Sequence, residues 1–339
     1  MKWYKTWIYG SILVLSMILL VVLNLWMGAV YIPFKDILEI LSMPFHTNNS
    51  FSFIILQLRL PQAITALFCG AALSVSGLML QTAFHNALAG PSIFGISSGA
   101  GLGVAIVMLC LGGSLSTVIF TVSGFLAVLI AAFVGAMLVT GIILLCSHWV
   151  KSDVMLLIVG IMIGYLSSSA IVLINFFATQ EGVKSYMMWG MGNFGSVSLQ
   201  LLPLFVILII IGLFCATLLV KPLNALLLGE NYARNLGINV QRVRNYLLIV
   251  TGLLTAVCTA FCGPIGFIGL IVPHIARLII QTDNHRQLLL FTMLMGAIIA
   301  LVCNLICVLF GEQGTLPLNA ITPIIGVPVV IYIIWNGRS

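Results

Sequence analysis

The ionisable residues of this 339-residue chain are few, and their positions limit the chemistry that it can perform. Only 6% of the residues are charged, and all seven carboxylates fall in expected loops or at the ends of apolar segments. They are Asp36, Glu39, Asp153, Glu181, Glu230, Asp283 and Glu312. A carrier driven by protons or sodium ions usually keeps a carboxylate inside the bilayer to bind the coupling ion. An ion-coupled secondary transporter of a small solute is thus disfavoured, although it stays the alternative interpretation.

The sequence also lacks the residue patterns usual for nucleotide binding and for hydrolytic catalysis. No G-x-x-x-x-G-K-[ST] run occurs and no glycine is followed directly by lysine, so the chain cannot cradle nucleotide phosphates in the usual way. Paired aspartates in a span, a Ser/His pair at depth and H-E-x-x-H, which an intramembrane enzyme would need, do not occur either. We predict that the chain is not an enzyme and carries no cofactor. If ATP drives it, a separate partner subunit must bind ATP and Mg.

The cysteines do not form a recognisable metal site. All eight lie in apolar segments, at positions 69, 110, 146, 215, 258, 262, 303 and 307. A structural metal site would need four closing ligands at recognisable spacing. We expect these thiols to be small packing residues where helices meet, and we predict no metal site.

The segments that position these residues are strongly apolar. Hydrophobic residues make up 62% of the chain and the mean hydropathy is +1.24. A membrane span needs about 20 mostly apolar residues, and ten segments qualify, near 7–30, 56–80, 92–112, 114–146, 153–177, 201–220, 245–263, 266–280, 288–310 and 319–335. The sequence predicts an all-α polytopic membrane protein, with one transmembrane domain over residues 1–339. The 266–280 segment is short and contains His274 and Arg277, which we expect to pair with backbone carbonyls or lipid phosphate.

The basic residues predict the orientation of the chain. Alternating through ten spans from an inside N-terminus places ten basic residues inside: Lys2, Lys5, Lys151, Lys221, Arg234, Arg242, Arg244, Arg277, Arg286 and Arg338. Three lie outside: Lys35, Arg59 and Lys184. This bias is the one that the positive-inside rule requires. We predict that both termini are cytoplasmic, and we attribute the net charge of +6 to topology rather than to nucleic-acid binding.

Small and polar residues within the spans predict close helix packing, because small side chains let membrane helices approach. Two series recur every four residues: Gly95, Gly99 and Gly103, and then Gly160, Gly164 and Ser168. Three asparagines in apolar runs are expected to bridge helices by hydrogen bonds: Asn24, Asn175 and Asn304.

The stretch from about 221 to 245 is a basic loop that contains a short helix. Gly229 and Gly237 bracket the helix, and glycine tolerates the left-handed conformation at a helix end. Ala233, one turn after Gly229, leaves room for close approach by another surface. This layout fits a coupling helix that seats in an ATPase, but charge alone favours an ordinary loop held by lipid head groups.

Three segments and the C-terminal run resemble the FecCD permease family, the membrane subunits of siderophore, haem and cobalamin importers. Residues 59–103, with RLPQ, HNALAGP and GISSGAGLG, resemble the family's R-L-P-R, N-P-L-A-x-P and G-A-x-x-G pattern. Residues 228–244 resemble its cytoplasmic loop, and residues 263–286 resemble its most distinctive run. The ending LPLNAITPIIGVPVVIYII resembles its last helix. Gln62, Ala87 and Asn304 depart from the pattern, which commonly has arginine, proline and aspartate there.

The resemblance implies the permease of a type II ABC importer, with about ten helices in an inverted repeat, in a bacterial cytoplasmic (inner) membrane. It implies a homodimer with a second copy, two cytoplasmic ATP-binding subunits, an extracytoplasmic binding protein and a metal chelate as cargo. With the L-G-x-x-x-A-R-x-L-G match it favours the coupling interpretation of the loop. The residues concerned are Gly229, Ala233, Arg234, Leu236 and Gly237.

Two further sites are expected along the pathway. Gln81, His85 and Asn86 lie at the inner end of the second span, where neutral hydrogen-bonding groups suit an inner gate; a capped turn is the equal alternative. Arg59 opens the second span before Pro61, which holds it near the helix start. In the family such an arginine looks like a docking contact for carboxylates of the binding protein, and the alternative is snorkelling to the interface with membrane lipid.

Overall fold

The computed structural model describes residues 2–42, 50–110, 120–150, 152–310 and 316–336, and every regular element within them is a helix. The longer helices are α1 (Lys2–Trp26), α4 (Leu60–Ala83), α6 (Phe120–Trp149), α7 (Asp153–Phe177), α9 (Leu202–Leu218), α12 (Val240–Cys262), α14 (His285–Leu309) and α15 (Leu318–Asn336). The shorter ones are α2 (Phe34–Ser42), α3 (Ser50–Phe53), α5 (Ile96–Ala105), α8 (Gln180–Gly190), α10 (Val220–Leu227), α11 (Glu230–Asn235) and α13 (Ile268–Ile280). π-Helical turns η1 (Ile54–Arg59) and η2 (Ile106–Cys110) and the 3₁₀ turn η3 (Phe194–Ser196) complete the set.

The apolar helices agree with the predicted spans. Six helices in the described ranges are long and apolar enough to cross a bilayer, and α9 with α10, bent by 49°, would be a seventh. Three shorter apolar helices, at Ile96–Leu109, Ile268–Ile280 and Leu318–Val329, match the other predicted segments. Helices suit this setting because they satisfy their backbone hydrogen bonds internally. The all-α membrane fold is confirmed, and the count of ten depends on the three short helices.

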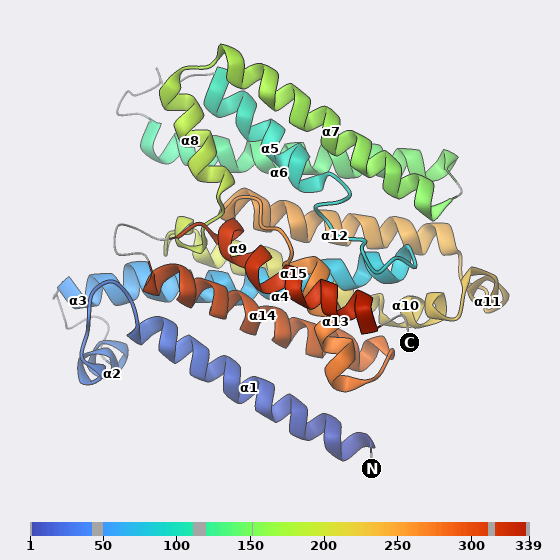
Figure 1. Cartoon of the computed structure of the whole chain (residues 1–339), viewed down its shortest axis with the longest axis horizontal. Coiled ribbons are helices and arrows are strands. Elements are labelled where there is room, and N and C mark those ends of the chain that lie inside the picture. The colour runs from blue at the N-terminus through green and yellow to red at the C-terminus, as the bar shows by residue number, and fades with distance from the viewer. Residues whose placement is uncertain (1, 43–49, 111–119, 151, 311–315, 337–339) are drawn as a thin grey trace.

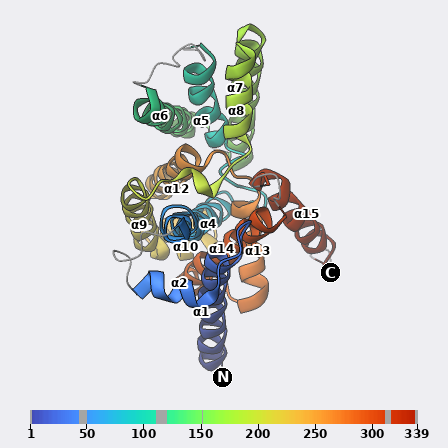
Figure 2. The ribbon, with the colours of Figure 1, turned by 90° about the vertical axis from the view of Figure 1, so that its left-hand side faces the viewer.

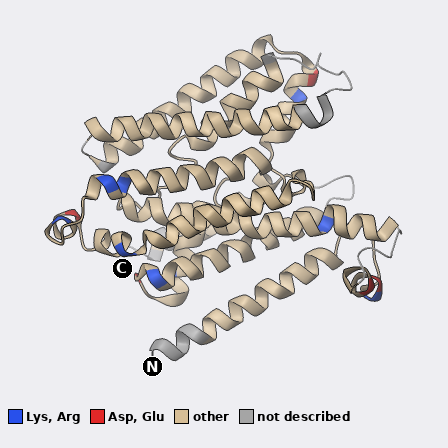
Figure 3. Cartoon of the chain, turned by 180° about the vertical axis from the view of Figure 1, so that it is seen from behind, with Lys and Arg blue, Asp and Glu red and all other residues tan. Residues whose placement is uncertain are grey.

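The charged residues gather at the two ends of the bundle (Figure 3). One end carries α10, α11 and the start of α12, and we call it the α11 end; the other carries α2, α3 and α8 (Figure 1). The start of α1 and the end of α15 both lie at the α11 end (Figure 1). Lys151, Glu312, Arg338 and the predicted boundary between 92–112 and 114–146 lie outside the described residues.

The two halves of the chain repeat one packing arrangement. Helix α4 packs on α13 and α14, whereas α12 packs on α5 and α6, so the first helix of each half lies against the second and third helices of the other half. Figure 2, which looks along the bundle, shows α5, α6, α7 and α8 grouped beside α12. The short second helices α5 and α13 both begin after a residue with positive φ, Gly95 (71°) and Phe267 (68°). This reciprocal packing of the two halves is the arrangement expected of the predicted inverted repeat.

Glycines make the closest helix contacts. A Cβ on Gly77 of α4 would overlap the carbonyl oxygen of Gly269 in α13, and a Cβ on Gly103 would overlap that of Ala131 in α6. The same holds between Gly99 and Gly135. The packing role predicted for the Gly95–Gly103 series is therefore confirmed, since no side chain fits between these backbones.

At the end opposite α11, one side chain joins three segments. The Asn319 amide at the start of α15 donates to the carbonyls of Gly190 (3.1 Å) and Pro264 (2.7 Å) and accepts from the Gly266 N–H (3.2 Å). The backbone there also pairs, since the Asn193 N–H donates to the carbonyl of Cys262 at 2.8 Å. The end of α8, the 263–267 loop and α15 are thus fastened together.

Candidate functional site

Helix α11 projects from the bundle, and it is flanked by two glycines whose backbone conformations other residues rarely adopt. Gly229 has φ +100° and Gly237 has φ +79°, and no described residue lies within 4 Å of a Cβ built on either. The Gly237 N–H donates to the carbonyl of Arg234 (2.9 Å), and the Ile238 N–H donates to that of Ala233 (3.0 Å). These two bonds form a Schellman motif, which ends a helix sharply. The left-handed conformation predicted for Gly237 is confirmed.

Exposed apolar side chains lie within α11 and next to both of its ends, and we call them the apolar row. Leu228, Tyr232 and Leu236, spaced four residues apart, are 63%, 50% and 58% exposed. A row of this kind, at a loop that also carries charges, is typical of a surface that another protein covers. Arg234 is exposed beside it.

Ala233, the next residue after Tyr232, is buried against the rest of the chain and is 0% exposed. The prediction that it leaves room for another protein's surface is wrong about the face, since the small side chain lets α11 lie close to its own bundle. The exposed apolar residues missed by the sequence analysis are Leu228 and Tyr232. Their spacing with Leu236 was visible, but it became informative only once the orientation of the helix was known.

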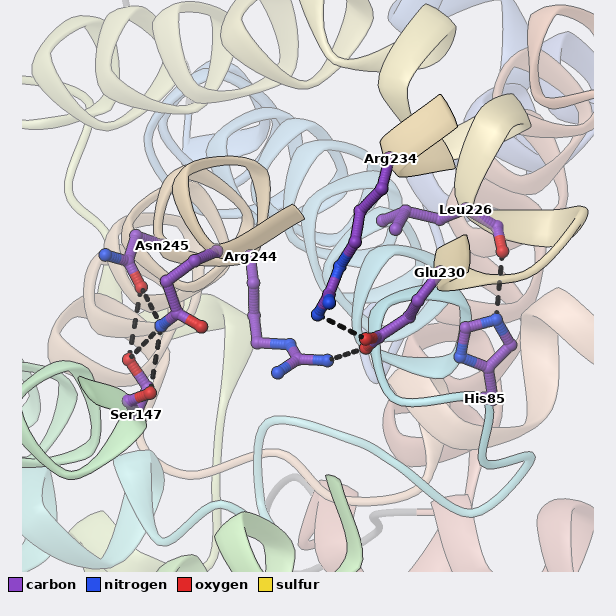
Figure 4. Close-up of polar contacts among 8 residues, drawn as sticks. His85, Ser147, Leu226, Glu230, Arg234, Arg244 and Asn245 are labelled. Atoms are coloured by element: carbon purple, nitrogen blue, oxygen red, sulfur yellow. Dashed lines mark hydrogen bonds and ion pairs between the residues drawn. The ribbon is translucent and has the colours of Figure 1, made fainter. Parts of the chain in front are cut away.

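An ion pair joins α11 to the start of α12 (Figure 4). Arg244 is buried, and its Nη2 lies 2.5 Å from Oε1 of Glu230 in the first turn of α11. The other oxygen of Glu230 accepts from the exposed Arg234 at 3.3 Å. The Arg244 guanidinium also lies over the Phe84 ring, 5.6 Å from its centre, in cation–π geometry. Three elements thus meet at Arg244: α11, α12 and the end of α4.

Helix α13 holds the segment that follows α4. Gln81 is buried, donates to the carbonyl of Leu270 (2.9 Å) and accepts from Arg277 (3.0 Å). His274 bonds the carbonyl of Ala87 at 2.8 Å through Nε2. The expectation of a carbonyl partner is confirmed for His274, whereas Arg277 donates to the side-chain oxygen of Gln81.

The other two residues of the predicted gate serve different neighbours. His85 adopts a positive φ of 44°, and its Nε2 donates to the carbonyl of Leu226 at the end of α10 (2.9 Å) (Figure 4). Asn86 accepts from the N–H of Leu88 at 2.9 Å, which is a capped turn within its own loop. Gln81, His85 and Asn86 are therefore close in the sequence but bond different neighbours. Gln81 bonds α13, His85 bonds α10, and Asn86 bonds its own loop.

A buried histidine that the sequence analysis missed ties three helices together at the same end. His285, at the start of α14, bonds Thr82 of α4 (2.8 Å) and Asn224 of α10 (3.1 Å) through its two ring nitrogens. The Asn224 side-chain oxygen also accepts from the His285 N–H at 2.8 Å. The only signal in the sequence was a polar run, 281–287, between apolar segments.

Arg59 does not lie on the surface. It is 7% exposed, and its guanidinium donates to the carbonyls of Leu25 and Trp26, both at 2.8 Å, and of Val30. The first two are carbonyls of the last turn of α1, which the helix itself leaves unpaired. The expectation of an exposed docking charge is corrected, because the side chain is buried against the end of α1 and bonds its carbonyls.

Two of the three predicted asparagine bridges are present. Asn304 of α14 donates to Asn24 of α1 (2.8 Å) and accepts from Gln62 of α4 (2.9 Å). Asn24 in turn donates to the carbonyl of Leu301 at 3.2 Å. For Asn175, the buried side-chain oxygen has no hydrogen-bond partner among the residues that the structure describes. The departures Gln62 and Asn304 therefore complement each other.

Comparison with known proteins gives one consistent result. The model of the FecCD transport family matches residues 16–336. The vitamin B12 import system permease protein BtuC of Klebsiella pneumoniae is 36% identical over 335 residues, 99% of this chain and 95% of that protein. BtuC of Citrobacter koseri is 37% identical over 284 residues, 83% of each chain. A solved structure, titled as an inward-facing conformation of a metal-chelate type ABC transporter, superposes with a TM-score of 0.83 at 27% identity, covering 97% of this chain and 99% of that one.

Proposed function

The chain belongs to the FecCD transport family, and we propose that it imports a large metal chelate across a bacterial cytoplasmic membrane with both termini cytoplasmic. It is a membrane protein and a permease of the metal-chelate or vitamin B12 type of ABC importer, whose ATPase activity lies in separate subunits. We infer that the functional unit contains a second copy of this chain, two ATP-binding subunits that bind ATP and Mg, and an extracytoplasmic binding protein.

We assign the coupling role to α11, and its exposed apolar row is the observation that carries this assignment. Leu228, Tyr232 and Leu236 would seat in a groove of an ATP-binding subunit, since burying exposed apolar side chains favours association. Gly229 and Gly237 act as hinges, because both adopt backbone conformations that other residues rarely adopt. Ala233 keeps α11 against the bundle, and Arg234 stands at the rim of the contact.

The segment from Gln81 to Asn86 is our proposed inner gate. It comprises the last residues of α4 and the turn that follows, and it is held from α10 and α13, so a shift of either helix would displace it. Hydrogen bonds of this kind can exchange partners at little net cost, since each is worth about 1 kcal/mol.

For the cargo we propose cobalamin as the first chelate to test, ahead of a ferric siderophore or haem. The relatives support this order, because they are named as vitamin B12 import permeases. The test is uptake of each labelled chelate by vesicles that contain the chain with its partners, together with identification of the ligand that copurifies with the binding protein. Uptake of a siderophore or haem but not cobalamin would reverse the order.

The coupling assignment is tested by Leu236→Asp, with Asn231→Asp as a matched control that adds the same charge outside the apolar row. Both side chains are exposed, so membrane abundance should stay unchanged in both variants. We expect Leu236→Asp to lose the ATP-binding subunit on copurification and to lose uptake, because a carboxylate would have to be buried in an apolar contact. Normal complex formation by Leu236→Asp would show that α11 is not the contact.

A further inference from the structure

The link between α11 and the rest of the chain is narrow. Glu230 has two cationic partners, and the exposed pair with Arg234, four residues on within α11, contributes little and joins nothing beyond the helix. The pair with Arg244 reaches another helix, and the Arg244 side chain is only 6% exposed. Removing one partner of a buried pair leaves a charge without compensation, so such a pair resists separation.

Arg244 sits in the first two turns of α12, which contact two separate segments. On one side the Arg244 guanidinium covers Phe84, the residue that ends α4 and precedes the 85–91 stretch. On the other side Gln241 donates to the carbonyl (2.9 Å) and hydroxyl (3.1 Å) of Ser147, and the Ser147 hydroxyl donates to Asn245 at 3.1 Å. Ser147 lies in the last turn of α6, close to the connection with α7.

Figure 4 shows the two sets of contacts side by side, with Arg244 reaching Glu230 while Asn245, the next residue, points to Ser147. A rigid helix that carries both sets must move both segments together. Helix α12 continues to Cys262 with most of its residues buried, so its start cannot shift without the packed body of the helix following.

We propose that the first two turns of α12 transmit displacement of α11 to the ends of α4 and α6, and that Arg244 is the positioning residue that connects them. Glu230 supplies the attachment on α11, Phe84 receives the motion on the α4 side, and Gln241 and Asn245 carry it to Ser147. This inference rests on the proposed coupling role of α11 but names a different set of residues, which lie behind the partner-facing row.

The experiment measures chelate uptake per ATP hydrolysed in proteoliposomes that contain the whole importer. Arg244→Met keeps the volume, removes the charge and leaves the Glu230 carboxylate, which is 31% exposed, in contact with solvent. Glu230→Gln removes the partner's charge but keeps a carbonyl oxygen beside the buried Arg244. Arg242→Met, on the exposed face of the same turn, is the control. We expect uptake per ATP to fall about tenfold in the two test variants, the size of a typical coupling between sites, while ATPase copurification and hydrolysis stay near normal.

The double variant Glu230→Gln/Arg244→Met separates a direct link from two independent losses. If the pair acts as one unit, the double variant should be no worse than the poorer single variant, because contacting residues are not additive. Unchanged uptake per ATP in Glu230→Gln, or fully additive losses in the double variant, would overturn the proposal. Loss of the ATP-binding subunit in Leu236→Asp is a separate result, so failure of the coupling assignment and failure of the Arg244 link are distinguishable.

Discussion

Arg59 illustrates how a single buried cation can hold a helix end in a membrane protein. Its guanidinium satisfies carbonyls at the end of α1 that have no partner within the helix and little water to bind. The neighbouring Gly28 is part of the same arrangement, since a Cβ there would press against the guanidinium. An arginine that a linear sequence places at an interface can therefore serve a contact that lies wholly inside one chain.

For Arg59→Gln we expect lower stability of the purified protein, by about 1.5–3 kcal/mol, the range for losing a hydrogen bond to a charged group. The measurement is the thermal unfolding midpoint in detergent. Lys35→Gln is the control, since Lys35 is exposed on α2 and surface substitutions usually change stability by less than about 0.5 kcal/mol. An unchanged midpoint together with weaker, salt-sensitive docking of the binding protein would restore the surface role.

The contrast between Arg59 and Gly237 explains what residue-level prediction could reach. The conformation of Gly237 follows from local stereochemistry, because a short helix must end where only glycine fits the left-handed turn. The carbonyl partners of Arg59 lie 29 to 34 positions away in the sequence, and Glu230, the partner of Arg244, lies 14 positions away. Such pairs depend on how helices pack, which the sequence pattern does not encode locally.

At the scale of elements, the apolar runs predicted the spanning helices because length and hydropathy fix them directly. The analysis missed α2, α3 and α8, which are short, and the π-helical turn Ile54–Arg59, which continues an apolar run without a change in composition. The glycine series predicted close packing correctly, but the identity of the facing helix had to come from the fold.

The contact between α4 and α13 gives a test of that packing. Gly77→Ala would place a methyl group on the carbonyl oxygen of Gly269, which is backbone and cannot rotate away. We expect the helices to separate at a cost of about 1–3 kcal/mol, as for overpacked cores, with lower membrane abundance and a lower unfolding midpoint. Gly141→Ala in α6 meets nothing within 4 Å and should be neutral or slightly stabilising. Equal behaviour of the two variants would mean that α4 and α13 are not in close contact.

At the scale of the whole molecule, the inverted repeat places two irregular segments at opposite ends of the bundle, 86–95 before α5 and 263–267 before α13. Each is fastened from several helices, the first by His274 and His85 and the second by Asn319. Broken or short helices at matching positions of a repeat are typical of transporters whose halves rock against each other. Alternating access in this chain would therefore require these two sets of hydrogen bonds to break one after the other.

The orientation of the molecule follows from its charges and can be measured. Besides Lys2 and Lys5 at the start of α1, the α11 end carries Lys221, Arg234, Arg242, Arg244, Arg277 and Arg286, and the other end carries Lys35, Arg59 and Lys184. The positive-inside rule then predicts that the α11 end, with the start of α1 and the end of α15, faces the cytoplasm. An ATPase contact at α11 requires the same orientation, so two independent arguments agree.

For this last prediction, Arg234→Cys in α11 and Lys184→Cys in α8 place one new thiol on an exposed position at each end. A maleimide that cannot cross membranes should label Lys184→Cys in intact spheroplasts and should label Arg234→Cys only after the membrane is opened. The parent chain, whose own thiols lie in apolar segments, gives the background. Labelling of Arg234→Cys in intact spheroplasts would mean that the α11 end faces outward, where no cytoplasmic ATPase can reach it. The topology and the coupling assignment would then both be wrong.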